Sequence, residues 1–412
     1  MKSRVLDWAA QFDTFCFLDN HEYNIPPNSI ECMLAAGVRK KISSTGGNAL
    51  KQLQGLIDIT DSCLFGHLSY DLKNEIEELT SDHADPVGFP DMFFFEPEIV
   101  IRLSAKQMII EGDDPDKVYS AIKKSIKRSV ISSAVAIKSR LSREEYIANV
   151  EQLKKHILRG DCYEINYCQQ FFDDHATIDP ISVYEKLSAL SPNPFSALYK
   201  LHDKWLICGS PERFLKKDGK RILSQPIKGT SKRDDRNGEI DQQQMRALLQ
   251  SSKERSENVM VVDLVRNDLS KVCEEGTVKV DELFGIYSFP QVHQMISTVS
   301  GQLNQGISFT DIIRATFPMG SMTGAPKKRV MELIEQYEKT KRGIFSGAVG
   351  YVAANGDFDL NVVIRSIMYN ASTQYLSYQA GSGITFYSDA EKEWEECLVK
   401  VEAIKKALGA NV

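Results

Sequence analysis

The chain has 412 residues, which is long enough for one large domain or two of ordinary size. Its composition, 42% apolar and 26% charged, is typical of a soluble globular protein. Lys and Arg total 50 against 56 Asp and Glu, and the formal charge of −6 argues against nucleic acid or a membrane as the main partner. A small anionic substrate stays compatible with this charge, because local basic residues can outweigh it.

The sequence also bears on the compartment. No stretch approaches 18 uninterrupted apolar residues, and the first residues lack the apolar core of a signal peptide. The eight cysteines are scattered without a Cys-x-x-Cys pair, which is typical of reduced thiols and gives a zinc site little support. We therefore expect a cytoplasmic protein.

The first 130 residues predict a β-rich N-terminal subdomain. Short apolar runs at 63–69 and 92–95 are broken by prolines and indicate strands and loops. The polar stretch 109–130 contains one expected helix, over 116–128, and is the best candidate for a boundary. We expect residues 1–130 to complete the sheet core of a main domain that spans 140–405.

The main domain is predicted to begin with a helix. Ser142 and Glu145 match a capping box, apolar residues then recur on one face, and Gly160 ends the run. Helices then alternate with strands, which are expected at 163–172, 197–208, 278–284, 345–354, 359–369 and 374–381. Turns such as that at 354–357 indicate antiparallel hairpins, so the pattern favours an α+β fold over a doubly wound parallel sheet.

Two expected helices each carry a Glu-x-x-Glu pair beside an apolar stripe. The pairs are Glu254 with Glu257 and Glu393 with Glu396, each one helical turn apart. Solvated glutamates on exposed faces are the simpler interpretation. Carboxylates that continue a buried stripe must be partly desolvated, however, and then need a cation or hydrogen-bond donors. One carboxylate from each of two helices, with substrate oxygens and waters, is how Mg²⁺ is usually held.

The second of these helices has clear sequence boundaries. Ser388 and Glu391 match a capping box at its start. Gly409 matches a C-terminal stop. We expect a single helix between these signals.

A lysine follows the strand expected over 221–224. Pro226 and Gly229 fix a turn, and Gly229 lets a substrate approach the backbone closely. Lys228 is then presented from a rigid loop between apolar neighbours. Desolvation next to a cation lowers the pKa of a lysine and makes it a usable nucleophile. The alternative is an ordinary surface lysine in a turn.

Two further residues are candidates for acid–base chemistry. Glu212 lies between a proline and an apolar run, where burial could raise its pKa and make it a general acid. His293 precedes a strand-like run, where a satisfied structural histidine is the commoner outcome.

Taken together, these segments resemble the chorismate-utilising enzymes, which include anthranilate, aminodeoxychorismate, isochorismate and salicylate synthases. The matching stretches run in the family's order over about two-thirds of the chain, at 210–215, 226–230, 254–269, 292–301, 317–327, 342–351, 365 and 380–400. The resemblance implies two large antiparallel sheets packed orthogonally and flanked by helices, with the site in a cleft between them.

The resemblance also implies roles for individual residues. Glu257 and Glu396 match the family's Mg²⁺ ligands, and Glu254 and Glu393 match its supporting carboxylates. Positions that bind or approach chorismate fall on Gly229, Thr230, Ser321, Arg365, Gly381, Gly383 and Lys400. The acid beside the C4 hydroxyl falls on Glu212, and the active-site histidine on His293.

Two positions discriminate within the family. Isochorismate and salicylate synthases resemble one another in a water-activating lysine where this chain has Glu164, so the resemblance disfavours hydroxylation. Lysine at position 228 is typical of the aminodeoxychorismate synthases, whereas anthranilate synthases typically carry alanine. The resemblance therefore implies amination at C4 through a covalent intermediate on Lys228.

The resemblance finally implies a partner, since the sequence contains no glutaminase elbow. A class I glutamine amidotransferase subunit is expected to supply ammonia. Two alternatives stay open: an anthranilate synthase large subunit with an unusual lysine, and a catalytically inert protein that only activates a glutaminase.

Overall fold

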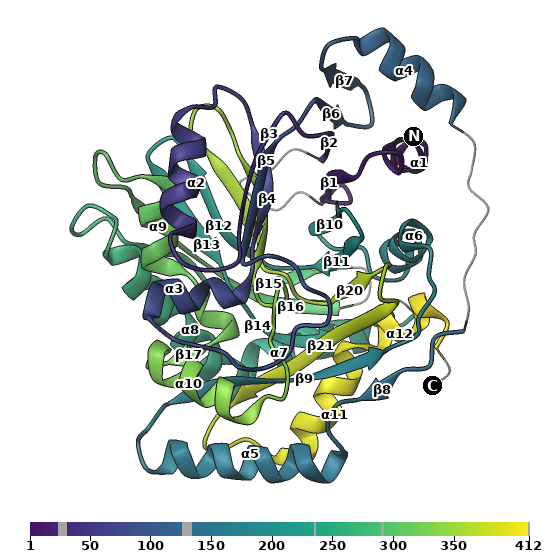
Figure 1. The fold of residues 1–412 in the computed structure, drawn as a ribbon. Helices are drawn as coiled ribbons and strands as arrows, with labels where there is room; N and C mark the ends of the chain where they lie inside the picture. The colour runs from purple at the N-terminus through teal and green to yellow at the C-terminus, as the bar shows by residue number, and fades with distance from the viewer. Residues whose placement is uncertain (24–30, 126–133, 235, 290–291, 411–412) are drawn as a thin grey trace.

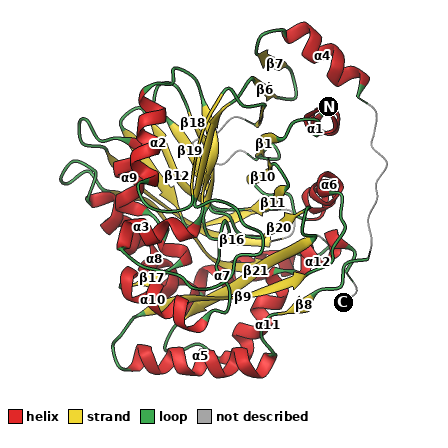
Figure 2. Ribbon diagram, in the orientation of Figure 1, coloured by secondary structure: helices red, strands yellow, loops and turns green. Residues whose placement is uncertain are grey.

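The structure, a computed structural model, describes residues 1–23, 31–125, 134–234, 236–289 and 292–410. Within these residues the strands form two antiparallel sheets, one of 11 strands and one of 10. Helices cover the outer faces of both sheets (Figures 1 and 2). The α+β fold with two large antiparallel sheets, expected from the sequence, is confirmed.

Each sheet combines hairpins of consecutive strands with strands from distant parts of the chain. The first sheet contains, in spatial order, β17 (Gly324–Ala325), β9 (Glu164–Asp173), β21 (Tyr375–Ile384), β20 (Ser366–Asn370), β11 (Lys204–Ser210), β10 (Phe195–Leu201), β1 (Thr14–Asp19), β2 (Cys32–Ala36), β6 (Ile99–Leu103) and β7 (Met108–Glu111), with β8 (Lys138–Ser139) on β9. The second contains β14 (Ile227–Lys232), β16 (Val292–Gln302), β13 (Arg221–Gln225), β12 (Arg213–Asp218), β19 (Phe358–Asn361), β18 (Ala348–Val352), β4 (Leu64–Leu68), β5 (Met92–Glu96) and β3 (Lys40–Ser44), with β15 (Lys279–Ser288) on β16.

The helices connect and cover these strands. They are α1 (Lys2–Ala9), α2 (Ala49–Asp58), α3 (Lys73–Glu77), α4 (Pro115–Lys124), α5 (Arg143–Leu158), α6 (Pro180–Leu190), α7 (Gly238–Gln250), α8 (Ser252–Ser270), α9 (Phe309–Thr316), α10 (Lys327–Tyr337), α11 (Ala390–Lys400) and α12 (Glu402–Leu408), with 3₁₀ turns η1 (Tyr70–Leu72) and η2 (Gly320–Met322). Helices α1, α6 and α12 lie on one side of the molecule, and α2, α8 and α9 lie on the other (Figure 1).

The N-terminal part of the chain contributes strands to both sheets. β1 lies between β10 and β2 in the first sheet, and β4 lies between β18 and β5 in the second. The helix expected over 116–128 is observed as α4, and residues 126–133 lie outside the described part of the chain.

Burial on both faces of the first sheet explains its apolar sequence. In β10, Ala197 and Tyr199 belong to the core that the two sheets share, whereas Leu198 belongs to the core under the covering helices. Successive strand residues point to opposite faces, so a strand with a core on each side is apolar throughout. Glu164, a residue of the candidate site described below, is the first residue of one such buried strand, β9.

Most predicted elements are present, with three corrections. The capping box of Ser142 and Glu145 begins α5 as expected. The runs expected as single strands at 197–208 and 359–369 are each two strands. The capping box expected from Ser388 and Glu391 is wrong, because Asp389 caps α11 and the Ser388 hydroxyl instead donates to the Gly383 carbonyl at 3.4 Å. The helix is also interrupted at Val401.

A buried arginine ties together the segments that carry the site. Arg342 is 3% exposed and donates two hydrogen bonds to the Glu338 carboxylate, at 2.6 and 3.0 Å. It also donates to the carbonyls of Asn166 in β9, at 2.8 Å, and Met322 in η2, at 2.6 Å. The planar guanidinium satisfies these acceptors at once, so it fixes β9 against the 3₁₀ turn.

Arg342→Met is expected to lower the free energy of unfolding by about 3–5 kcal/mol, because it leaves the buried Glu338 carboxylate without its partner. Arg329→Met on α10 is the control, since Arg329 pairs with Glu332 at the surface and should change stability by less than about 1 kcal/mol. Urea denaturation of both variants measures the difference. Equal losses would contradict the role assigned to Arg342.

Candidate active site

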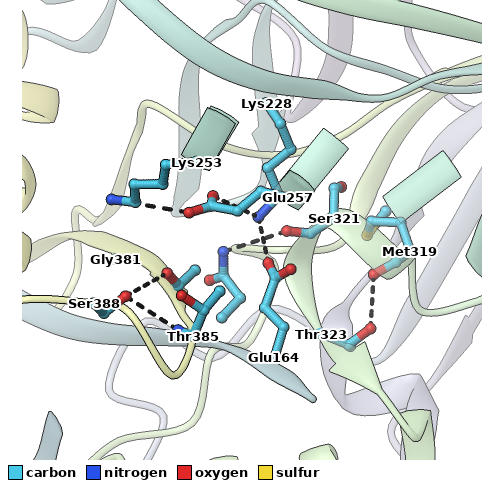
Figure 3. A network of polar contacts seen from close by, with 12 residues as sticks. Glu164, Lys228, Lys253, Glu257, Met319, Ser321, Thr323, Gly381, Thr385 and Ser388 are labelled. Atoms are coloured by element: carbon cyan, nitrogen blue, oxygen red, sulfur yellow. Dashed lines mark hydrogen bonds and ion pairs between the residues drawn. The ribbon is translucent and has the colours of Figure 1, made fainter. Parts of the chain in front are cut away.

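The candidate site lies where elements of both sheets and two helices meet. Lys228 comes from β14 of the second sheet, and Glu164 comes from the first residue of β9 in the first sheet. Glu257 lies on α8, while Glu393 and Glu396 lie on α11. Figure 3 shows Lys228 pointing toward Glu164, with Glu257 between the ammonium groups of Lys228 and Lys253.

An irregularity in the strand aims Lys228 inward. The register between β14 and β16 shifts between Ile227 and Thr230, so Lys228 and Gly229 lie in a bulge. Gly229 has φ +91°, a conformation that glycine adopts readily. Such bulges redirect a side chain out of the regular alternation. The Lys228 side chain is consequently 9% exposed, which is not the surface lysine of the alternative interpretation.

Two carboxylates hold the Lys228 ammonium. Its Nζ donates to Glu164 Oε1 at 2.7 Å and lies 4.0 Å from Glu257 Oε2. Burial acts to lower the pKa of Lys228, but Glu164 and Glu257 outweigh burial and raise the pKa above its ordinary value. Without a bound cation, the pKa of Lys228 is therefore raised and not lowered. The expectation from the sequence placed a cation beside Lys228 and did not include its contacts with Glu164 and Glu257.

Glycine backbones allow this close packing. A Cβ on Gly383, in β21, would lie 2.6 Å from Glu164 Oε1 and 2.9 Å from Lys228 Nζ. A Cβ on Gly229 would lie 2.9 Å from Glu254 Oε2. Both distances are too short for a real side chain, so glycine at these positions leaves space for the charged groups.

Two further lysines contact the carboxylates of the two helices, and one of them bridges α8 and α11. Lys253 Nζ lies 3.1 Å from Glu393 Oε1 and 3.8 Å from Glu257 Oε1, joining α11 to α8. Lys400 Nζ lies 2.6 Å from Glu396 Oε1 and donates to the Gly381 carbonyl at 2.8 Å. The two Glu-x-x-Glu pairs predicted from the sequence therefore lie in one place.

We call the carboxylates of Glu164, Glu254, Glu257, Glu393 and Glu396 the acidic cluster. Within the described residues these five groups face three ammonium groups, so two negative charges are in excess when all are ionised. Burial raises the pKa of Glu257 to about 7, against the effect of Lys228. The excess negative charge leaves the cluster suited to a further cation.

The donor set fits a hard divalent cation. Glu257 Oε1 and Glu393 Oε2 are buried without a hydrogen-bond partner among the described residues, and carboxylate oxygens are ligands that Mg²⁺ prefers. Still, no group of three or more His, Cys, Asp or Glu side chains is gathered ready for an ion in the described part of the chain. Lys253 instead lies beside one carboxylate of each helix.

A second acid lies close enough to Lys228 to interact with its charge. Glu212 is 4% exposed and lines a small cavity together with Pro226 and Ser321. Burial raises the pKa of Glu212 to about 7, although the cations of Lys228 and Arg365 act in the opposite direction. Burial lowers the pKa of Arg365 to about 10, so Arg365 stays charged near neutral pH. Glu212 thus has the pKa of a usable general acid.

The contacts of two predicted residues lie elsewhere. The His293 ring is 3.0 Å from Asp241 Oδ1 and 2.8 Å from the Ser288 hydroxyl, so these two groups engage both ring nitrogens. Thr230 is exposed and pairs with Gln294 across the strands. Their roles toward a substrate stay predictions.

Sequence reasoning missed two functional contacts. Glu164 was considered only as a residue that is not a lysine, and its pairing with Lys228 spans 64 positions without any local signal. Lys253 was not considered, although it lies four residues before Glu257 and so on the same helical face.

Comparisons with known proteins assign the family. The family described as chorismate binding enzyme matches residues 27–406, so the chain belongs to the chorismate-binding enzymes. Aminodeoxychorismate synthase component 1 of Salmonella typhimurium is 35% identical over 345 residues, which cover 82% of this chain and 75% of the relative. Anthranilate synthase component 1 of Thermus thermophilus is 32% identical over 357 residues, covering 83% and 76%.

Solved structures agree with the fold. Anthranilate synthase component I from Streptococcus pneumoniae superposes with a TM-score of 0.79 at 25% identity, covering 94% of each chain. The menaquinone-specific isochorismate synthase of Escherichia coli gives a TM-score of 0.78 at 16% identity, covering 98% of this chain and 91% of that one. The resemblance stated from the sequence is confirmed.

Every described helix is too short or too polar to span a bilayer.

Glu212→Gln is expected to stabilise the protein more at pH 8 than at pH 5. Because the folded state raises the pKa of Glu212 from 4.5 to about 7, its carboxyl favours folding below pH 4.5, and this contribution is lost as pH rises through 7. Glutamine does not titrate, so the variant should gain about 2–3 kcal/mol relative to the wild type over that window. Thermal melts at both pH values measure the gain. A difference independent of pH would contradict the raised pKa.

Proposed function

We propose that this protein is the chorismate-binding component of an aminodeoxychorismate synthase, which converts chorismate and ammonia to 4-amino-4-deoxychorismate and water. The observation that carries the proposal is the buried Lys228 ammonium, aimed at the family's site and held by Glu164 and Glu257. Relatives named aminodeoxychorismate synthase component 1, at 32–39% identity, support it. The product would serve p-aminobenzoate and folate synthesis.

The first step requires a neutral amine and an acid. After Lys228 gives its proton to Glu164, which accepts a hydrogen bond from Nζ, the nitrogen attacks C2 of chorismate, both ring double bonds shift, and the C4 hydroxyl leaves. Glu212 donates the proton that lets this hydroxyl leave as water, since its raised pKa keeps part of it protonated near neutral pH. A carbon–nitrogen bond now joins Lys228 to the ring.

The second step reverses the allylic shift. Ammonia attacks C4, both ring double bonds return to their starting positions, and the bond between C2 and the Lys228 nitrogen breaks. The amine leaves neutral, and the new ammonium at C4 gives a proton to the Glu212 carboxylate, which restores the acid. Two displacements thus place nitrogen at C4, whereas direct attack of ammonia at C2 would lead toward anthranilate.

We propose that Glu257 and Glu396 ligate Mg²⁺, with Glu254 and Glu393 as supporting carboxylates. The unpartnered oxygens and excess negative charge of the acidic cluster support this. Bound Mg²⁺ would hold the ring carboxylate of chorismate and offset the carboxylates that raise the pKa of Lys228. Arg365, with its fork of donors, and Lys400 would bind carboxylates of the substrate.

Ammonia is proposed to come from a separate class I glutamine amidotransferase subunit. The designation component 1 in the names of the relatives supports a second component. Anthranilate synthase components of similar identity make amination at C2 the second candidate function. A glutaminase activator without catalysis of its own is the third, and it requires no function of Glu257 or Lys228.

The product test separates these functions. Incubated with chorismate, Mg²⁺ and ammonium, the protein is expected to form 4-amino-4-deoxychorismate, identified by mass spectrometry. Lys228→Ala should lower this 4-amination by at least about 100-fold, because it removes the attacking nitrogen. Lys217→Ala, on strand β12 of the same sheet, is the control and should leave the rate unchanged.

Three results would contradict the proposal. Anthranilate as the product without an added lyase would assign amination to C2. Unchanged 4-amination in Lys228→Ala would exclude the nucleophile. Full glutaminase activation by a Glu257→Gln variant, with no chorismate turnover by the wild type, would support the inert activator.

A further inference from the structure

The ammonium group of Lys253 stands between the two helices that carry the Glu-x-x-Glu pairs. It lies 3.1 Å from Glu393 Oε1 on α11 and 3.8 Å from Glu257 Oε1 on α8. Figure 3 shows it on the opposite side of Glu257 from Lys228. A positive charge therefore already stands where carboxylates of the two helices face each other.

The carboxylates that Lys253 contacts are incompletely satisfied. The side chain of Glu393 is 1% exposed and that of Glu257 is 9% exposed. Each has one oxygen without a hydrogen-bond partner among the described residues, Oε2 in Glu393 and Oε1 in Glu257. A single ammonium at these distances cannot replace the water that four carboxylate oxygens have lost.

Lys253 differs from the other two lysines of the site in its freedom to move. Lys228 is buried in the strand bulge, and Lys400 is anchored on the Gly381 carbonyl. The Lys253 side chain is 41% exposed and begins in the first turn of α8. Its four-carbon stem can turn the ammonium into water without disturbing the core.

We propose that Lys253 is a displaceable counter-ion that occupies the acidic cluster until a divalent cation replaces it, and that it thereby sets the affinity for that cation. This inference rests on the magnesium site proposed above. The ammonium keeps its proton and swings outward. The oxygens of Glu393 and Glu257 that lack a hydrogen-bond partner would then be open to the ion or to its water.

Electrostatics predicts how removal of the Lys253 charge would change both Mg²⁺ binding and stability. An ammonium and a divalent cation a few ångströms apart repel each other, so binding of the ion includes the cost of moving Lys253. Without the ion, the same ammonium stabilises Glu393 and adds to the effect of Lys228 on Glu257. Removing the charge should therefore weaken the metal-free fold and strengthen metal binding together.

Calorimetric titration with MgCl₂ alone, without chorismate, tests the inference. Lys253→Met keeps the stem and removes the charge, and is expected to bind Mg²⁺ roughly tenfold more tightly than the wild type. Lys253→Arg keeps the charge and should bind no more tightly than the wild type. Lys392→Met on α11 is the matched control for net charge, since Lys392 is exposed, and should bind like the wild type.

Thermal melting provides a second readout that does not depend on activity. Without Mg²⁺, Lys253→Met should melt below the wild type, and millimolar MgCl₂ should narrow or reverse the difference. Equal or weaker Mg²⁺ binding by Lys253→Met, or a melting deficit that MgCl₂ leaves unchanged, would overturn the inference. If neither protein binds Mg²⁺, the inference falls with the proposed metal, while the chorismate product assay still decides the amination separately.

Discussion

The site depends on the burial of the Lys228 ammonium beside two carboxylates. A lysine that is 9% exposed needs anionic partners, and here they come from β9 of the first sheet and from α8. Lys228 itself belongs to the second sheet, so this contact joins the ends of both sheets at the point where chemistry is proposed. A Cβ on Gly383 or Gly229 would displace the ends of the charged side chains packed there.

Burial and charge divide the site into two parts, the acidic cluster and the surroundings of Glu212, with different proposed roles. Across the acidic cluster as a whole, five carboxylates outnumber three lysines and attract a cation, so this side is suited to anchoring an anionic substrate through a metal. Around Glu212, burial without a direct ion pair keeps a carboxyl partly protonated near pH 7, so this side is suited to releasing a hydroxyl. Lys228 lies between these two environments, where an amine could reach a ring held by one and activated by the other.

Local signals in the sequence predicted much of this arrangement, and long-range contacts account for what they missed. The capping box of α5 and the spacing of Glu254 and Glu257 involve neighbours three residues apart, and both are present in the structure. The capping box predicted at Ser388 is absent because the Ser388 hydroxyl donates to the Gly383 carbonyl of β21 and does not cap α11. Without a bound cation the pKa of Lys228 is raised, because Glu164, 64 positions earlier in the chain, and Glu257 outweigh burial; the lowered pKa expected beside a cation stays a prediction.

The central claim is that Lys228 bonds to the substrate ring. Rapid quenching of the protein with chorismate and Mg²⁺, in the absence of ammonia, followed by intact-protein mass spectrometry and peptide mapping, tests it most directly. The account predicts a covalent adduct with the mass of chorismate less one water, located on the peptide that contains Lys228. A protein that forms 4-amino-4-deoxychorismate when ammonium is added, but never carries this adduct or carries it on another residue, would contradict the account.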